Sequence, residues 1–471
     1  MARRHIEGGC REFQQQATVQ RRDFLRVGGL GVLGLSLPAL WQAEARASNY
    51  GAERTTARAK SCIFLFLSGG PSQLETFDPK PEATAEHRGD FKPIQSRLPG
   101  VLVGEHLPDV ARQLQHCALV RTAWHKYGGH FGGHRYALTG HAAPGSPDQA
   151  ARPDDKPGII GLAAKHYRST AHLPTLMMPW LATDQGSGAS GGMSAGTLGK
   201  QFDPVQIEVD TKSAERGDPP VFRIPEFALQ PGLTAARVDK RRELLALIEE
   251  QRGAMIDSAT QSELDGLYAR AYDLLTSPKI KDGFELNQEP VALRDKYGMN
   301  AFGQSCLLAR RQVERGARFI QVNFSRTVTQ KSYGWDTHGK GYETMTRELL
   351  PKLNAGLSTL IADLHDRGML KDTLVVAMGE FGRTPKIKKD GGRDHWPQCY
   401  SLLLAGGGVH GGLVHGVSDR NAAYPKEDPV EARQILLTIM TLLGIPTVSE
   451  DVQGRVAPLF PGSDPIERLY T

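Results

Sequence analysis

Residues 351–380 read PKLNAGLSTLIADLHDRGMLKDTLVVAMGE, and the pattern in this stretch decides the fold. In its first half, leucine and isoleucine recur on one face of a helix that we expect to begin at Pro351 and end at Gly368. The run Thr373–Met378 that follows has no polar face, which is typical of a strand buried on both sides. A helix that leads into such a strand predicts a parallel sheet covered by helices.

Two further apolar runs extend this prediction. Residues Cys62–Leu67 are apolar on both alternating faces, as a central strand requires, and Arg318–Phe324 form a strand before the helix. A last helix is expected with Asp428 as its cap, Pro429 at its first position and Gly444 at its end. The sequence therefore predicts an α/β fold in which helices cover both faces of a mostly parallel sheet.

One long segment interrupts the alternation of strands and helices. Residues 235–316 are mostly helical in pattern and highly charged, without a strand signal. We interpret them as a helical insertion that caps one end of the sheet. The insertion belongs to a single α/β domain at residues 59–471, which follows a leader at residues 1–47 and a linker at residues 48–58.

Composition and charge exclude several classes of protein. Of the 471 residues, 39% are hydrophobic and 23% are charged, which excludes collagen-like, disordered and coiled-coil proteins. The 57 Lys and Arg against 52 Asp and Glu leave a net charge of +5, too small for the basic surface of a nucleic-acid-binding protein, so we expect no nucleic-acid partner. The five cysteines are far apart, which indicates neither a disulfide framework nor a cysteine metal site.

The leader has the features of an export signal. Residues Arg21–Leu25 read RRDFL and precede the glycine-rich apolar run Val27–Leu40, which is too short to span a bilayer comfortably. Residues Ala45–Ala47 fit a cleavage site of small residues. Together these features resemble a twin-arginine signal. We expect export by this route to the periplasm or the outside of the cell, with no permanent membrane span unless the leader is retained.

Polar residues that can carry chemistry follow the predicted strands, where sites form in open parallel sheets. Asp336 and His338 follow one strand, and their spacing points both side chains to one side of an extended segment. Glu380 and His395 follow another strand. Carboxylate and imidazole ligands suit zinc, manganese or iron better than magnesium. The set predicts a metal site, although each residue alone is also compatible with a cap, an ion pair or an exposed position.

Residues 124–140 read WHKYGGHFGGHRYALTG and contain three histidines. His130 and His134 are four residues apart, so they share a face if this segment is helical. The flanking glycines predict a loop that runs into a helix, whose N-terminus attracts an anion. There is no HExxH motif, so a metalloprotease helix is not indicated. A purely structural role for the loop remains an alternative.

Several segments, in order, resemble the alkaline phosphatase and sulfatase superfamily. Residues 373–382 are similar to its strand with metal ligands at the end, and residues 130–140 are similar to the sulfatase nucleophile motif. Five segments of the chain read SGGPSQLETFDPKP, HRYALTG, GWDTH, GEFGRTP and DHWP. Together with the leader, they more closely resemble the exported family named domain of unknown function 1501. This resemblance covers nearly the whole mature chain and implies an alkaline-phosphatase-like fold, while the family's name leaves the activity unassigned.

The resemblance also implies roles for individual residues. Asp336, His338 and His395 match, in order, the Asp, His and His of one phosphatase-type metal site. Glu380 takes the place of a metal-binding Asp at the other site, where most ligands are replaced. His130 stands where a sulfatase has the cysteine that becomes formylglycine, so a formylglycine sulfatase is not expected. His130 can complete the second metal site, act as a nucleophile or acid/base, or leave the attack to water activated by metal.

We therefore expect an exported hydrolase of a phosphate or sulfate ester that uses a divalent metal, zinc or manganese rather than magnesium or calcium. The expected partner is an anionic ester substrate, with a polysaccharide as one candidate. The expected metal ligands are Asp336, His338, Glu380, His395 and His130, and the expected catalytic residues are His130, Glu380 as a base, and Arg383 as a clamp on the anion. The alternative is a non-catalytic binding protein on the same fold.

Overall fold

The computed structural model describes residues 57–143, 145–146, 148–168, 175–179, 189–210, 219–223, 240, 244, 282–324, 334–450 and 455–471. The chain divides into two compact units, Met1–Thr56 and Ala57–Thr471, and the described residues all belong to the second. The predicted leader and most of the predicted linker lie outside the described residues. Within the described ranges, no helix has the length and apolar character needed to cross a membrane.

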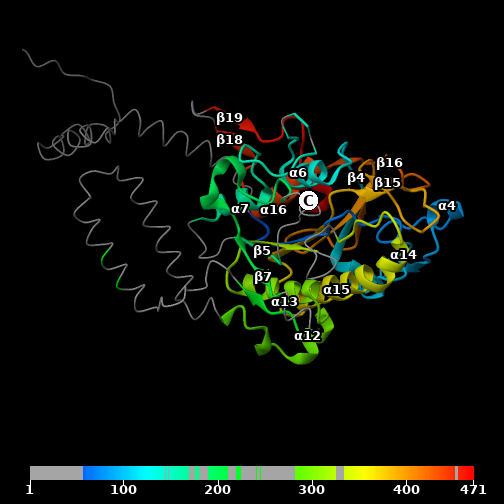
Figure 1. Ribbon diagram of the computed structural model, residues 1–471, viewed down its shortest axis with the longest axis horizontal. Helices are drawn as coiled ribbons and strands as arrows, with labels where there is room; N and C mark the ends of the chain where they lie inside the picture. Colours follow the sequence, from blue (N-terminus) through cyan, green and yellow to red (C-terminus); the bar gives the residue numbers. More distant parts are fainter. Residues whose placement is uncertain are drawn as a thin grey trace, which may run out of the picture. The chain divides into compact units, whose positions relative to one another are not determined.

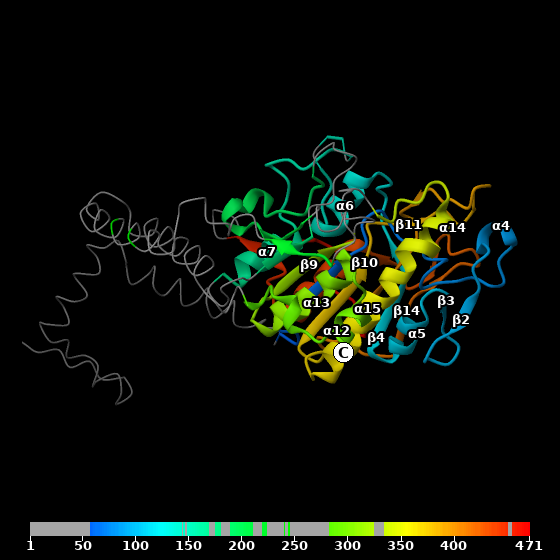
Figure 2. The same cartoon turned by 60° about the horizontal axis from the view of Figure 1, so that its bottom comes forward.

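A nine-stranded sheet forms the centre of the described part of the chain (Figures 1 and 2). In spatial order its strands are β14 (Leu413–His415), β4 (Cys117–Trp124), β13 (Tyr400–Ala405), β10 (Thr373–Met378), β1 (Ser61–Phe66), β9 (Phe319–Asn323), β5 (Thr175–Met178) and β6 (Val205–Gln206), and β17 (Val430–Glu431) also pairs with β4. Strand β13 runs antiparallel to β10 and β4, and the other pairs are parallel. The sheet is therefore mostly parallel, as predicted.

The three predicted strands lie side by side in the middle of this sheet. Strand β1 is fully buried and pairs with β10 on one side and β9 on the other. The bounds of all three differ from the predicted ones by at most one residue at each end. In this register Phe66 is the partner of both Asn323 and Met378, so the three strands end at the same level. The residues that follow them meet at one edge of the sheet.

Helices cover both faces of the sheet, as Figures 1 and 2 show. On one face, α5 (Pro108–Gln113), α13 (Ala301–Glu314) and α15 (Leu350–Asp366) pack against Ile63 and Leu65. On the other, α6 (His130–Thr139), α7 (Ile159–His166) and α16 (Ala432–Leu443) pack against Phe64 and Phe66. Alternate residues of β1 thus enter two separate cores, because successive side chains of a strand point to opposite faces. The predicted α/β fold is confirmed.

Shorter elements surround the sheet, and five two-stranded ribbons lie among the described residues. The ribbons pair β2 (Pro93–Gln95) with β3 (Leu102–Gly104), β7 (Glu208–Val209) with β8 (Phe222–Arg223), β11 (Gly382–Arg383) with β12 (His395–Trp396), β15 (Val417–Ser418) with β16 (Pro425–Glu427), and β18 (Val448–Glu450) with β19 (Val456–Pro458). The short helices are α4 (Ala85–Arg88), α12 (Val291–Tyr297) and α14 (Gly341–Thr344), and a π-helical turn at Met345–Leu349 joins α14 to α15.

The last helix, α16, begins later than predicted. The expectation that Asp428 caps it is wrong, because Asp428 lies in a bend with φ of +49° and Val430–Glu431 then form β17, which pairs in parallel with the end of β4. The helix begins at Ala432 with Glu431 as its cap, and Glu431 and Gln434 form a capping box. Its end at Gly444, with φ of 68°, is as predicted. Pairing with the sheet therefore overrode the local capping signal.

The predicted helical insertion at residues 235–316 is described only in part. Residues 235–281, apart from Lys240 and Leu244, lie outside the described residues. The described remainder contains α12 and α13, so it is helical. However, α13 packs on a face of the sheet beside α15 and leads directly into β9. The expectation of a cap over one end of the sheet is therefore wrong for α13, which is a regular covering helix of the fold.

The core on the α6 face generates a prediction for stability. Phe64 is fully buried and stacks on Phe66 and Phe319, with ring centroids 6.1 and 6.0 Å apart. We expect Phe64→Ala to lower the free energy of unfolding by about 3–5 kcal/mol, because the surrounding strands cannot fill the cavity. Val291→Ala, at a side chain that is 68% exposed, is the control and should change it by less than about 0.5 kcal/mol. Urea unfolding followed by circular dichroism measures both, and equal effects would contradict this account of the core.

Candidate metal centre

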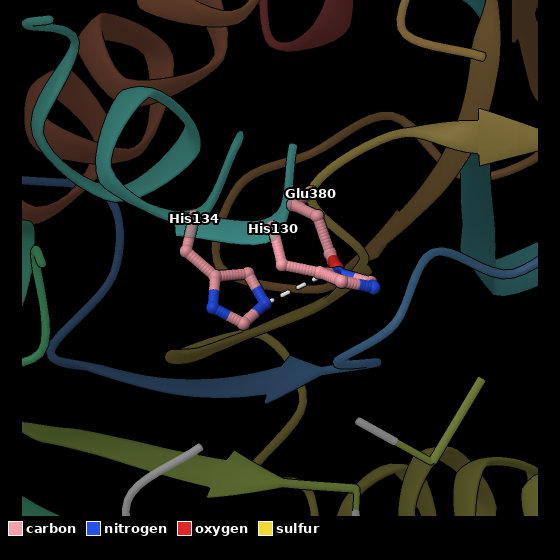
Figure 3. A group of neighbouring side chains, drawn as sticks. All are labelled: His130, His134 and Glu380. Atoms are coloured by element: carbon pink, nitrogen blue, oxygen red, sulfur yellow. Dashed lines mark hydrogen bonds and ion pairs between the residues drawn. The ribbon is translucent and has the colours of Figure 1, made fainter. Parts of the chain in front are cut away.

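The candidate site lies where β1, β9 and β10 end. Gly69 follows β1, Asp336 follows β9 along the chain, and Glu380 follows β10. The first two turns of α6 add His130 and His134 from above this edge (Figure 3). The site thus occupies the carboxyl end of a parallel sheet, the position expected for this class of fold.

Glu380 and the two histidines of α6 form a buried group of ligand atoms. Oε1 of Glu380 lies 2.8 Å from Nδ1 of His130 and 3.2 Å from Nε2 of His134. Figure 3 shows both rings, one helical turn apart, directed at this carboxylate. The Gly69 N–H donates to both carboxylate oxygens, at 2.9 and 3.0 Å. Glu380 is completely buried, so these contacts fix its position and its charge.

Two glycines make these close contacts possible. Gly69 has φ of +108°, and a Cβ there would lie 2.5 Å from the backbone nitrogen of Asp336. A Cβ at Gly133 would lie 3.0 Å from the ring of Phe381 and 3.3 Å from Cγ of Glu380. Gly133, which lies between the two histidines, therefore lets α6 approach the site, and Gly69 lets the turn after β1 approach it.

A second group consists of Asp336, His338 and His395. Oδ1 of Asp336 lies 3.0 Å from Nε2 of His338 and 3.0 Å from Nε2 of His395. The two Nε2 atoms lie 2.9 Å from each other. The structure therefore brings together three residues that the sequence predicted to share a metal, from segments almost 60 positions apart.

The outer nitrogen of each ring in this group is occupied. Nδ1 of His338 lies 2.7 Å from the carboxylate of Asp394, and Nδ1 of His395 lies 2.7 Å from the carbonyl oxygen of Gly128. A carboxylate and a carbonyl only accept hydrogen bonds, so both Nδ1 atoms carry the proton. The Nε2 atom of each ring then faces the other ring and Asp336. Three ligand atoms that converge in this way can share a cation.

The donor set fits a divalent metal ion. A tetrahedral zinc ion with ligands at about 2.1 Å sets its ligand atoms about 3.4 Å apart, so only a small outward movement of the two rings is needed. The bonds from Asp394 and Gly128 orient the imidazoles, as the outer contacts of metal-binding histidines usually do. Nε2 of His130 lies 3.3 Å from the second oxygen of Asp336 and adds a further nitrogen at the same place.

The two groups differ in their exposure. The side chains of Asp336 and His338 are 25% and 42% exposed, whereas His134 and Glu380 are completely buried. His130 lies beside both groups, because one of its ring nitrogens lies within 4.8 Å of ligand atoms of His134 and Glu380, and one within 4.8 Å of ligand atoms of Asp336 and His395. A substrate can therefore reach the group that contains Asp336 but not the group that contains Glu380.

His130 interacts electrostatically with a carboxylate of each group, Asp336 and Glu380. Burial by itself lowers the pKa of His130, but hydrogen bonds to Asp336 and Glu380 outweigh burial and raise it to about 9. Burial raises the pKa of both carboxyl groups, yet the neighbouring histidines, and for Asp336 also Arg383, bring each well below its usual range. Without a metal, a protonated imidazole thus lies between two carboxylates.

Arg383 does not occupy the position predicted for it. The sequence suggested a clamp on the anionic substrate, but the guanidinium is completely buried. It donates to the carbonyl oxygens of Gly69, Gly70 and Trp335 and, at 2.8 Å, to Oδ1 of Asp336. Arg383 therefore holds the backbone around the site and orients Asp336, with no donor directed at solvent.

Sequence reasoning missed two residues of the site. His134 was paired with His130 by spacing, but its contact with Glu380 was not foreseen. Asp394, which directly precedes His395, was not considered as the partner of His338. The four-residue spacing in α6 and the Asp–His pair in DHWP were the available signals. Neither signal says which carboxylate faces which ring, because that depends on how distant loops meet.

Solved structures that are similar to the chain include a sulfatase from Pseudoalteromonas sp., a phosphonate monoester hydrolase from Silicibacter pomeroyi and a TAB5 alkaline phosphatase variant. The sulfatase is 11% identical, with 87% of this chain and 72% of that chain covered and a TM-score of 0.38. The phosphonate hydrolase is 15% identical (87% and 78% covered, TM-score 0.35), and the phosphatase is 11% identical (83% and 99% covered, TM-score 0.34). Values this low carry no conclusion about activity.

No curated protein matches the chain significantly. The family described as "Protein of unknown function (DUF1501)" matches residues 59–469, which is nearly all of the predicted α/β domain. The matched range contains the SGGPSQLETFDPKP, GWDTH and GEFGRTP segments, which carry the resemblance to this family in the sequence. The chain therefore belongs to the DUF1501 family.

Proposed function

We propose that the protein is a metal-dependent hydrolase that cleaves a phosphate or sulfate ester. The observation that carries this proposal is the convergence of two imidazole lone pairs and a carboxylate, from His338, His395 and Asp336, at an accessible edge of the sheet. These three residues would hold zinc or manganese. The ion would supply a Lewis acid for the ester oxygen and would lower the pKa of an attacking water.

His130 and Glu380 supply the proton transfers in this proposal. Nε2 of His130 faces the proposed metal position beside Asp336, while Nδ1 is held by Glu380. A carboxylate on one nitrogen fixes the orientation of the ring and stabilises its protonated form, so the other nitrogen can give a proton to the leaving oxygen. Glu380 thereby acts as the partner of His130, and a role as ligand in the buried group is the alternative that the group with His134 supports.

The leader supports a proposal about location. The RRDFL segment and the short apolar run that follows it favour export by the twin-arginine route, to the periplasm or the outside of the cell. A folded, exported hydrolase would meet anionic esters there as substrates. Secretion of a reporter fused to residues 1–47, and its loss when Arg21 and Arg22 are replaced by lysine, would test this route.

The first prediction of the proposed function concerns the metal content of the protein. Full-length protein purified without chelator should contain one zinc or manganese ion per chain, measured by mass spectrometry of the metals. His338→Ala should weaken binding by about ten-fold or more, because it removes one of three protein ligands. His410→Ala, at an exposed histidine outside the site, is the matched control and should leave the metal content unchanged. Equal metal content in all three proteins would refute the assigned ligands.

The second prediction concerns activity. The metal-loaded protein should hydrolyse p-nitrophenyl phosphate or sulfate, and Asp336→Asn or a chelator should abolish turnover. His130→Gln should lower kcat by about 100-fold or more while the ion remains bound, because the variant loses acid–base transfer only. Loss of the ion in His130→Gln would instead make His130 a ligand. A metal-loaded wild-type protein that leaves both esters intact would favour the non-catalytic binding protein.

The third prediction separates the two roles considered for Arg383. If this residue holds the backbone and Asp336, Arg383→Lys should lower the free energy of unfolding by about 3 kcal/mol or more, because a buried charge network is broken. The same variant should weaken metal binding, since Asp336 loses its orienting partner. Chemical denaturation and metal titration measure these effects. If the variant keeps normal stability and metal affinity and loses only substrate affinity, the result would instead support the role of Arg383 as a clamp on the substrate.

A further inference from the structure

A cleft of about 430 Å³ opens at the end of β4. We call it the aromatic cleft, and it is lined by Trp124, Lys126, Gln398, Tyr424, Pro425 and Pro429. Trp124 is the last residue of β4, and Tyr424 directly precedes β16, which packs against β4 (Figure 1). The cleft therefore lies between a strand of the central sheet and an adjoining ribbon.

The exposed aromatic side chains of the described residues are concentrated in this cleft. Trp124 is 39% exposed and Tyr424 is 53% exposed, and no other aromatic side chain in the described ranges reaches this class of exposure. Trp396 packs edge-on against Tyr424 with ring centroids 5.6 Å apart, and its Nε1 donates to the carbonyl oxygen of Ala423 at 2.6 Å. The loop that carries Tyr424 is therefore anchored while the tyrosine ring itself faces solvent.

The segments that form the cleft also form the metal centre. Residues 124–130 begin with Trp124 in the cleft and end with His130 in the site. Between them, the carbonyl oxygen of Gly128 holds Nδ1 of His395. The neighbouring segment runs from His395 to Gln398 in the cleft, and the His125 N–H donates to the carbonyl oxygen of Pro397 at 2.9 Å. The cleft and the proposed metal position are therefore built in part from the same two segments of the chain.

We infer that the aromatic cleft is a sugar subsite, and that the proposed hydrolase acts on an anionic ester carried by an oligosaccharide. A pyranose ring presents an apolar face of C–H groups, which packs on exposed aromatic rings such as Trp124 and Tyr424. Its hydroxyl groups need polar partners, and Lys126 and Gln398 offer them. The ammonium group of Lys126 also favours a sulfated or phosphorylated sugar. This inference rests on the proposed function for the choice of an anionic ester.

Binding to a panel of sugars tests this inference on the full-length protein. The probes are sulfated hexasaccharides from carrageenan, fucoidan and chondroitin sulfate, with their desulfated counterparts, measured by isothermal titration calorimetry. Trp124→Ala and Tyr424→Ala should each weaken binding of the recognised sugar by about ten-fold, and Trp124→Phe should restore most of it. Lys126→Ala should weaken binding of the sulfated form only. Met299→Ala, at an exposed apolar residue outside the cleft, should have no effect.

The metal centre provides the control that separates this inference from the proposed function. Asp336→Asn should abolish hydrolysis and leave the affinity for a desulfated hexasaccharide unchanged, because the ring stacks on the cleft and not on the metal. Sugar binding without any hydrolysis would support the assignment of the cleft as a sugar subsite and would contradict only the proposed function. The inference is overturned if no sugar of the panel binds, if the two aromatic variants bind as the wild type does, or if proline-rich peptides bind the cleft in place of sugars.

Discussion

Two carboxylates that face the same imidazole are the constraint on which the rest of this structure depends. Glu380 is completely buried and Asp336 is partly buried, and His130 lies between them. A buried carboxylate is stable only when hydrogen bonds and an opposite charge compensate for lost hydration. The edge of the sheet must therefore always supply positive charge, as a proton on His130, as Arg383 or as a metal ion. This need links the chemistry of the site to the stability of the fold.

The fold meets this constraint with backbone as well as side chains. Parallel pairing of β1, β9 and β10 in matched register brings their ends together. Arg383 then bonds the carbonyl oxygens of the turns after β1 and before Asp336, while the N–H of Gly69 bonds Glu380. Each of these contacts joins segments far apart in the sequence. The accessible group of Asp336, His338 and His395 thus rests on a rigid, buried base, which is what a precisely spaced ligand set needs.

The sequence allowed prediction of those features that depend on local pattern. Strands β1 and β10 were found because residues buried on both faces leave an uninterrupted apolar run, and β9 was found from its place before the helix that leads into β10. Asp336, His338 and His395 were predicted to lie together because polar residues that follow such strands meet at one edge of the sheet, and the structure places the three in contact. The start of α16 was missed because β17 pairs with β4, a contact between distant segments. The contacts of Arg383 were not predicted for the same reason. The sequence does not show whether an arginine near a site faces the substrate or backbone carbonyl oxygens.

The position of His130 between the two groups would limit how many ions its ring could bind at one time. A neutral imidazole has one lone pair, on either Nδ1 or Nε2, and carries its proton on the other nitrogen. Ligation beside Asp336 uses Nε2 and leaves the proton on Nδ1, facing Glu380, whereas ligation beside Glu380 demands the opposite tautomer. The accessible and the buried groups consequently compete for a single electron pair. Ligation through this ring would be mutually exclusive, so an ion bound by His130 in one group would leave the other group without this nitrogen.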